Sequence, residues 1–483
     1  MTELVAGIDV ATQAVRVVLA DRGGRVHAQA DVPLPPPQHP EPGWSEQDAR
    51  SWWPAAAEAL RRATARVDRD VHRLVAVAPT ATSGTIVLVD AEGEPLGPAL
   101  LYNDRRAATE AARAQAAGRA RWDALGLTIA PSFALAKLGW LAGERALDGA
   151  TGAWSAADLI VERLTGAPPT ADWSHALKTG YDAVRREWPR EVLDALGVSP
   201  DLLPPVAPPG SLGGEVSAAA ARETGLPEGC QVRLGMTDGC TAQLACGAVA
   251  AGRFVSVLGT TLVIKGASEQ LVRDPAGVVY SHLHPGGLWL PGGASNTGGE
   301  ALQAGFAGAD LRALDAAAAA HGPARCVAYP LVRNGERFPF LEPRARGFVV
   351  GEPADEVEAY RAALEGVAFV ERLAYEHLAR LGVEAVDGIA TAGGGAGSVV
   401  WNRIRATVLG RPLFRPRHPS SAFGAALLAA AGTVHDGIDA AVAAMVGRAD
   451  EFEPDPREAE ALDASYLRFV DELRTRGHLM PGR

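Results

Sequence analysis

Residues 4–32 read LVAGIDVATQAVRVVLADRGGRVHAQADV, which is three apolar runs separated by two polar turns. Short runs rich in β-branched residues and punctuated by Gly and Asp are typical of β-strands joined by tight turns. We expect an antiparallel meander with strands over residues 4–10, 15–20 and 26–32. Its first turn, Ala11-Thr12-Gln13-Ala14, then lies at one end of a sheet, directly after the carboxylate of Asp9.

The same order of elements returns in the second half of the chain. Short apolar runs at 254–258 and 262–265 precede a long amphipathic stretch at 355–380, then a strand at 388–391, a Gly-rich turn and a helix. Alternating strands and helices indicate α/β domains, and 483 residues are too many for one core. The repeated order predicts two similar α/β domains, residues 1–247 and 248–483, with a cleft between them.

Composition excludes several classes of function. The chain is 47% hydrophobic and has a formal net charge of −11, which disfavours a broad electrostatic contact with nucleic acid or anionic lipid. The four cysteines have no spacing suited to zinc and fit a reducing compartment. No signal peptide or membrane-spanning run is recognised, so we expect a cytoplasmic protein that binds neither membranes nor nucleic acid.

Two acidic residues follow apolar runs, and each has two interpretations. Asp9 either caps its turn or holds a cation, because an unpaired buried charge is costly. Asp238, within Gly235-Met236-Thr237-Asp238-Gly239, either caps a helix of small residues or acts as a base towards a nearby hydroxyl. The residues alone leave both alternatives open.

Two Gly-rich turns in the second half could bind an anion. The turn Leu258-Gly259-Thr260-Thr261 offers hydroxyl and N–H groups, and 392–398 reads AGGGAGS between a strand and a helix. Neither GxxxxGK[ST] nor GxGxxG occurs in these turns, which removes the P-loop and Rossmann signatures. A further pair, Glu336-Arg337, is interpreted as a structural ion pair that fixes a loop.

Taken in order, these segments resemble the FGGY family of carbohydrate kinases over nearly the whole chain. The resemblance rests on GIDVATQAVR, PGWSEQDARSWW, LLYNDRRA, GMTDGCTAQLACGA, SVLGTTLVIKG, YPLVRNGERFPFLEPRARG, LEGVAF, TAGGGAGSVVWNRIRA and AFGAALLAAAG. It implies two actin-like (ribonuclease H-like) domains that close over ATP, Mg²⁺ and a sugar. It also implies an ATP-dependent sugar kinase, a monomer or homodimer whose partners are a small sugar and ATP.

The resemblance assigns a role to each marked residue. Asp238 matches the catalytic base that takes the proton of the sugar hydroxyl, and Asp9 matches the acid that organises Mg²⁺. Both also belong to the implied substrate site, with Thr12, Ser83 and Gly84. The nucleotide side is implied to comprise Thr12, Gly259, Thr260, Thr261, Gly298, Gly299, Gly394, Gly395 and Ser398.

Several stretches, including SHALKTGYD and YSHLHPGGLWLPGGASNTGG, resemble the D-ribulose kinase branch of cyanobacteria and plants. Xylulose kinases usually carry a Gln-His pair where this chain has Thr80-Ala81-Thr82-Ser83. D-Ribulose is therefore the first expected substrate, and D-xylulose, ribitol and glycerol are the alternatives. A weakly active binding module is a further alternative, because Ala11 stands where the family usually has Gly and Gln13 where a small residue is usual.

Overall fold

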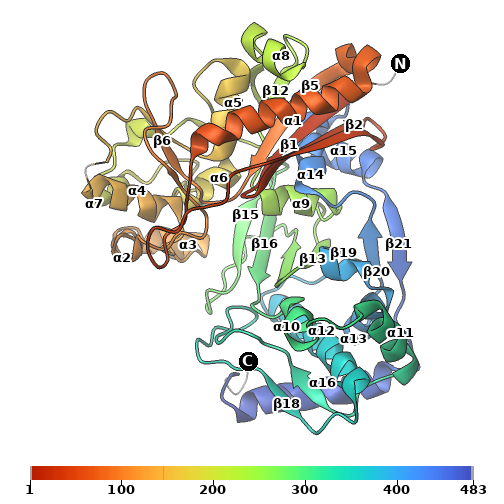
Figure 1. Ribbon diagram of the computed structural model, residues 1–483. Helices are drawn as coiled ribbons and strands as arrows, with labels where there is room; N and C mark the ends of the chain where they lie inside the picture. Colours follow the sequence, from red (N-terminus) through yellow and green to blue (C-terminus); the bar gives the residue numbers. More distant parts are fainter. Residues whose placement is uncertain (1–2, 145, 480–483) are drawn as a thin grey trace. The chain divides into compact units, whose positions relative to one another are not determined.

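The computed structural model describes residues 3–144 and 146–479 and divides into two compact units (Figure 1). Unit 1 comprises Met1–Ala245, His282–Leu288 and Ser420–Val446, and unit 2 comprises Cys246–Ser281, Trp289–Pro419 and Gly447–Arg483. These units differ from the two contiguous domains predicted from the sequence, because two later segments join unit 1. The first change of unit, after Ala245, lies two residues before the predicted boundary at 247.

Unit 1 is built on a six-stranded sheet. The predicted meander is present, because its three strands run antiparallel. The first of them also pairs in parallel with the strand over residues 74–81. The sheet order is β11 (Leu212–Glu215), β12 (Gln231–Arg233), β5 (Leu74–Ala81), β1 (Leu4–Val10), β2 (Ala14–Asp21) and β3 (Val26–Pro33).

Helices cover both faces of this sheet. Alternate residues of β1, such as Ile8, pack in one core with α1 (Trp52–Val67), α5 (Ala156–Thr165) and α8 (Ala218–Thr224). The other face meets α14 (Ser421–Ala430), where a Cβ on Gly7 would lie 1.9 Å from the carbonyl oxygen of Ala422. Because Asp9 is two residues from Gly7, it projects on the α14 face.

The remaining elements of unit 1 are short. Three two-stranded pairs are β4 (Glu46–Gln47) with β7 (Ala99–Leu100), β6 (Val87–Val89) with β8 (Gly152–Trp154), and β9 (Ala171–Asp172) with β10 (Val206–Ala207). The helices are α2 (Ala108–Ala117), α3 (Arg119–Leu125), α4 (Ala134–Gly143), α6 (Trp173–Lys178), α7 (Arg190–Leu196), α9 (Asp238–Ala245) and α15 (Gly437–Met445).

Unit 2 repeats the topology that β3-β2-β1-β5-β12 has in unit 1. Its sheet has seven strands, in the order β15 (Tyr280–Leu283), β16 (Trp289–Ala294), β14 (Leu262–Gly266), β13 (Phe254–Leu258), β19 (Ile389–Ala392), β20 (Leu413–Pro416) and β21 (Arg448–Phe452). From β16 onward, as in β3-β2-β1-β5-β12-β11, two antiparallel pairings are followed by two parallel ones and a last antiparallel one. The predicted repeat of element order is therefore confirmed as a repeat of fold.

The helices of unit 2 include the long one expected from the sequence. That helix, α12 (Glu356–Arg380), is capped by the side chain of Asp355. The other elements are α10 (Glu300–Gly305), α11 (Leu311–His321), α13 (Val399–Leu409), α16 (Ala459–Thr475), the hairpin of β17 (Val327–Tyr329) and β18 (Phe348–Val350), and β15 (Tyr280–Leu283), in which the chain passes from unit 2 to unit 1.

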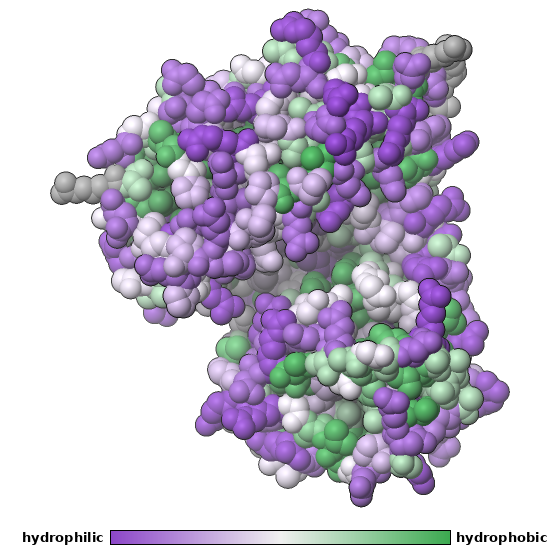
Figure 2. All heavy atoms as spheres, in the orientation of Figure 1, coloured by the Kyte–Doolittle hydropathy of each residue, from purple (hydrophilic) through white to green (hydrophobic). Residues whose placement is uncertain are grey.

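Among the described residues, no helix is both long and apolar enough to cross a membrane. Figure 2 shows hydrophilic side chains over much of the surface around α1, whose buried residues all lie on one side of that helix. This is the pattern of a helix that packs one face on a sheet and exposes the other to water.

Candidate active site

Three parallel strands of unit 1 bring the predicted sugar-side residues to one edge of its sheet. Asp9 is near the end of β1, the sugar-side loop (residues 81–84) begins at the last residue of β5, and Asp238 follows β12. Asp9 is in register with Thr80, and an isolated bridge joins Ala81 to Thr237. In α/β sheets, the carboxyl ends of parallel strands are where ligands bind.

Asp9 is a buried carboxylate in an unfavourable electrostatic position. It is 6% exposed, and its ion pair is with Arg16, at 3.5 Å from Nη1 to Oδ2, whose own side chain is 45% exposed. Burial and the nearby charge of Asp238 together raise the pKa of Asp9 to about 7, and Arg16 offsets this only in part. A second negative charge near a buried carboxylate favours either a shared proton or a cation.

The surroundings of Asp9 fit a divalent cation. Its Oδ1 is buried and has no hydrogen-bond partner among the residues that the structure describes. No group of three or more His, Cys, Asp or Glu within the described ranges forms a metal cage. Mg²⁺ in phosphoryl transfer is usually held by one or two carboxylates, water and the substrate's phosphates, so a single buried oxygen with a neighbouring acid is sufficient.

The turn that carries Asp238 (residues 235–239, the base turn) packs closely on β5. A Cβ on Gly235 would lie 1.5 Å from the carbonyl oxygen of Pro79, so only glycine allows this approach. The hydroxyl of Thr80 donates to the carbonyl of Met236 at 2.6 Å. Asp238 itself begins α9, where its Oδ1 accepts from the N–H of Gly239 at 2.6 Å. Asp238 therefore stands at the start of a helix, as predicted. A residue in this position could act either as a helix cap or as a base.

The sugar-side loop contains an unsatisfied hydroxyl. The Oγ of Ser83 is buried and has no hydrogen-bond partner among the described residues, and Gly84 has a φ of +90°. Leaving a buried hydroxyl unpaired costs about 1–3 kcal/mol, so a ligand hydroxyl at this point would be favoured.

Two lysines that the sequence did not single out flank this loop. Lys137 is fully buried and donates to the carbonyls of Gly84, at 2.9 Å, and Leu101, at 2.5 Å. Burial lowers the pKa of Lys137 to about 7. The Nζ of Lys178 lies 3.4 Å from the carbonyl of Ser83. The sequence around each lysine does not show that its side chain will contact a loop so distant along the chain.

The first hairpin tolerates its unusual residues. Ala11 is not among the residues with positive φ, and its N–H donates to the carbonyl of Ala14 at 3.1 Å. The carbonyl of Thr12 accepts from the side-chain amide of Gln47 at 2.9 Å. The turn between β1 and β2 is therefore formed with Ala11 where the family usually has Gly.

The nucleotide-side segments (residues 259–261, 298–299 and 393–398) belong to unit 2. The first two contact each other, and the third packs on Leu258, directly before the first. The N–H of Gly299 donates to the carbonyl of Gly259 at 2.8 Å, and a Cβ on Gly298 would lie 2.6 Å from backbone atoms of Thr261. A Cβ on Gly395 would meet the side chain of Leu258 at 2.6 Å, whereas one on Gly394 would meet nothing within 4 Å. Gly394 thus faces open space.

The Gly-rich turn is a 3-10 helix rather than the start of an α-helix. It spans Gly394–Gly397, and α13 begins only at Val399, capped by the Oγ of Ser398, which accepts from the N–H of Trp401 at 3.0 Å. The sequence missed what anchors this turn. Asn402 donates to the carbonyl of Ala396 at 2.9 Å, and the neighbouring Arg405 forms a fully buried ion pair with Glu371.

Glu336 fixes a loop through hydrogen bonds from several groups, among them the backbone N–H of Arg337 at 2.9 Å. Its carboxylate accepts from the hydroxyls of Ser295 and Thr297, each at 2.9 Å, and from Tyr329 at 3.0 Å. It also accepts from the backbone N–H of Asn296 at 2.6 Å. These bonds hold the chain directly before Gly298 and Gly299.

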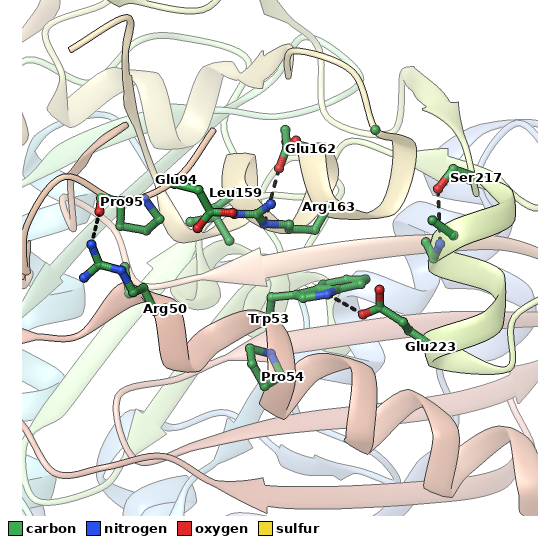
Figure 3. Close-up of a pocket in the computed structure, with 14 residues that line it drawn as sticks. Arg50, Trp53, Pro54, Glu94, Pro95, Leu159, Glu162, Arg163, Ser217 and Glu223 are labelled. Carbon is green, nitrogen blue, oxygen red and sulfur yellow. Dashed lines mark hydrogen bonds and ion pairs between the residues drawn. The ribbon is translucent and has the colours of Figure 1, made fainter. Parts of the chain in front are cut away.

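A pocket of about 480 Å³ lies apart from these residues, between α1, α5, α8 and the loop after β6 (Figure 3). Its charged groups already have partners: Arg163 pairs with Glu94 at 2.7 Å, and Trp53 donates to Glu223 at 2.8 Å (Figure 3). None of the predicted site residues lines it. We therefore do not count this pocket as part of the candidate site.

Family models match both halves of the chain. Residues 4–245 match the N-terminal domain of the FGGY family of carbohydrate kinases, and residues 254–433 match the C-terminal domain of the same family.

Individual relatives agree with this. A xylulose kinase of Streptomyces rubiginosus is 30% identical over 88% of this chain and 87% of its own length. A glycerol kinase of Methylibium petroleiphilum is 28% identical over 89% of this chain and 91% of its own. The crystal structure of a xylulose kinase from Rhodospirillum rubrum superposes with a TM-score of 0.88 and 30% identity, covering 98% of this chain and 99% of that one.

Proposed function

Because the chain belongs to the FGGY family of carbohydrate kinases, which are ATP-dependent phosphotransferases, we propose that it phosphorylates a ketopentose with Asp238 as the general base. The observation that carries this proposal is the pair of neighbouring acids at one sheet edge. Asp9 has an unsatisfied buried oxygen and a pKa raised to about 7, and Asp238 is the charged neighbour that helps to raise it.

The chemistry assigned to these residues is direct. The carboxylate of Asp238 accepts the proton of one sugar hydroxyl while that oxygen forms its bond to the γ-phosphorus of ATP. The bond from phosphorus to the bridging oxygen breaks, and ADP leaves. Ser83 and the backbone of the sugar-side loop orient the sugar, and the nucleotide-side segments offer N–H and hydroxyl groups to the phosphates. Mg²⁺, held by Asp9, would neutralise charge on the transferring phosphates.

The sugar is the finer part of the proposal. We place D-ribulose first, with D-ribulose 5-phosphate as product, because residues 80–83 are Thr-Ala-Thr-Ser where a Gln-His pair would indicate D-xylulose. D-Xylulose is the second candidate, since several relatives bear the name xylulose kinase. Which hydroxyls the sugar-side loop selects depends on side chains near Ser83.

A substrate panel tests the proposal. ADP release is measured with Mg²⁺ and ATP against D-ribulose, D-xylulose, ribitol, glycerol and an aldopentose. We expect the highest kcat/KM with D-ribulose, and a higher value with D-xylulose would move the assignment to the second candidate. Turnover with no member of the panel would contradict the kinase proposal and would favour a module that only binds its ligands.

Gly394→Ala tests the nucleotide side. The new methyl group would meet no protein atom within 4 Å, so the variant should be as stable as the wild type. If ATP approaches this face, the methyl group crowds it, and overpacking of about 1.4 kcal/mol raises the KM for ATP about tenfold. Gly143→Ala, at the end of α4, is the matched control because it also meets nothing within 4 Å. An unchanged KM for ATP in Gly394→Ala would remove Gly394 from the nucleotide side.

A further inference from the structure

A buried polar cluster at the start of α6 contacts both the base turn (residues 235–239) and the sugar-side loop (residues 81–84). Asp172 is the N-cap of this helix, and its carboxylate accepts from the backbone N–H groups of Ser174, at 2.8 Å, and His175, at 3.1 Å. The same carboxylate accepts from the side chains of these two residues, each at 2.5 Å. The side chains of Asp172 and His175 are each 2% exposed.

Ser174 connects this cluster to the base turn. Its one hydroxyl proton is donated to Asp172, so its oxygen is left to accept a hydrogen bond. The donor is the backbone N–H of Thr237, at 2.9 Å, the residue directly before Asp238. The position of the base turn is therefore tied to the helix cap through one side-chain oxygen.

His175 connects the same cluster to the sugar-side loop. Its Nε2 lies 3.2 Å from the carbonyl oxygen of Ala81, and its Nδ1 faces the carboxylate of Asp172. Both partners can only accept, so both ring nitrogens must carry a proton and the ring is an imidazolium. Asp172 and Asp158 of α5 are the charged groups that stabilise it. Burial lowers the pKa of His175, but these acids outweigh burial and raise it to about 9.

We propose that Asp172, Ser174 and His175 are positioning residues that hold the base turn and the sugar-side loop in one fixed relation. A buried ion pair is seldom more stabilising than well-packed apolar side chains, so its use here is to specify geometry. A misplacement of about 1 Å at a reacting group can cost roughly 100-fold in rate. The assignment of the two segments to the base and the sugar rests on the function proposed above.

The first test uses Ser174→Ala, which leaves the Thr237 N–H without its acceptor. We expect faster amide hydrogen exchange in peptides that cover residues 234–240, and a kcat for sugar phosphorylation lower by about 10- to 100-fold with an unchanged KM for ATP. Ser174→Thr keeps the hydroxyl and should restore part of both. Ser217→Ala is the matched control, since Ser217 caps α8 in the same unit and contacts neither segment.

The second test separates the two connections. His175→Gln keeps one N–H donor and His175→Leu keeps none, so the KM for the sugar should rise more in the leucine variant, with exchange increasing at residues 81–86. Thermal denaturation checks that each variant is folded. His175→Leu is the variant at risk of misfolding because it leaves Asp172 buried without its cation, and Ser174→Ala remains decisive in that case.

The outcomes of these tests are distinct. A folded Ser174→Ala with wild-type exchange at 234–240, or with wild-type kcat, overturns the proposal. If the wild-type protein phosphorylates no sugar, the proposed function fails on its own. The exchange measurements and calorimetric sugar binding then decide whether this cluster holds the two segments. Unchanged exchange at 234–240 in Ser174→Ala overturns the proposal, and so does a folded His175→Leu in which exchange at 81–86 and sugar affinity are both unchanged.

Discussion

Replacing Asp238 by asparagine is expected to lower kcat for sugar phosphorylation by about 10²–10⁴-fold, the usual contribution of a positioned general base. Asparagine keeps an oxygen that can accept from the N–H of Gly239, as Oδ1 of Asp238 does at 2.6 Å, so the start of α9 should be preserved. What it loses is a group able to take the proton of the sugar hydroxyl. The measurement is ADP release at saturating ATP and sugar, beside thermal denaturation.

The same experiment decides between the two interpretations of Asp238 left open by the sequence. A residue that only caps a helix should cost stability when removed, about 1 kcal/mol, and leave kcat unchanged. Asp310→Ala is the control for that case, because Asp310 caps α11 by accepting from the N–H groups of Arg312 and Ala313. Activity of Asp238→Asn within about tenfold of the wild type would show that Asp238 is a cap and not the base.

The repeated fold was predictable because each unit begins with the same physical pattern. Apolar runs of strand length, tight turns and a later strand before a polar or Gly-rich loop define the order β1-β2-β3-β5 and its counterpart in unit 2. Functional residues then fall at the carboxyl ends of parallel strands, which is why Asp9, the sugar-side loop and Asp238 lie at one edge.

The place of α14 could not be predicted in the same way. All but the first of its residues are buried, so it has no polar face to show which sheet it packs against. The close approach of its backbone to Gly7 places it in unit 1, although its sequence position predicts the second domain. Contacts of this kind depend on complementary shape between segments far apart in the chain. The amino-acid composition of a helix does not show which sheet it fits.

The role of His175 was also beyond sequence reasoning. In the stretch SHALKTGYD it is one polar residue among several, and a lone histidine is usually structural. The role proposed for it follows only from what lies at its two ring nitrogens. One faces Asp172, the N-cap of its own helix, and the other faces Ala81, the last residue of β5, about ninety residues earlier in the chain. Predicting it would require the tertiary fold first.

Asp9→Asn should have opposite effects on activity and on stability. Without its carboxylate, the proposed Mg²⁺ position loses the negative charge of a buried side chain, and we expect kcat to fall by about 10²–10³-fold at saturating Mg²⁺. Arg16 loses its partner, but its side chain is 45% exposed and can be hydrated. The measurement is ADP release over a range of Mg²⁺ concentrations, with Asp123→Asn, at an exposed position of α3, as the control.

The pH dependence of stability follows from the raised pKa of Asp9. Its value in the folded chain is about 7, against 3.8 for the free group, so ionising Asp9 opposes folding. Its contribution to the unfolding free energy is present in full below about pH 4 and is lost as the pH rises to about 7. Asp9→Asn abolishes this loss, so the variant should be more stable than the ligand-free wild type at pH 8, by on the order of 1–4 kcal/mol.

Mg²⁺ should stabilise the wild type at high pH, where the ionised carboxylate of Asp9 otherwise opposes folding. The cation binds the ionised carboxylate, so its apparent affinity should rise with pH up to about 7 and level off above it. At pH 8, Mg²⁺ with a nucleotide should therefore raise the melting temperature of the wild type more than that of Asp9→Asn. A residue that merely caps its turn predicts the contrary: Asp9→Asn would be destabilised at pH 8, and Mg²⁺ would affect both proteins equally.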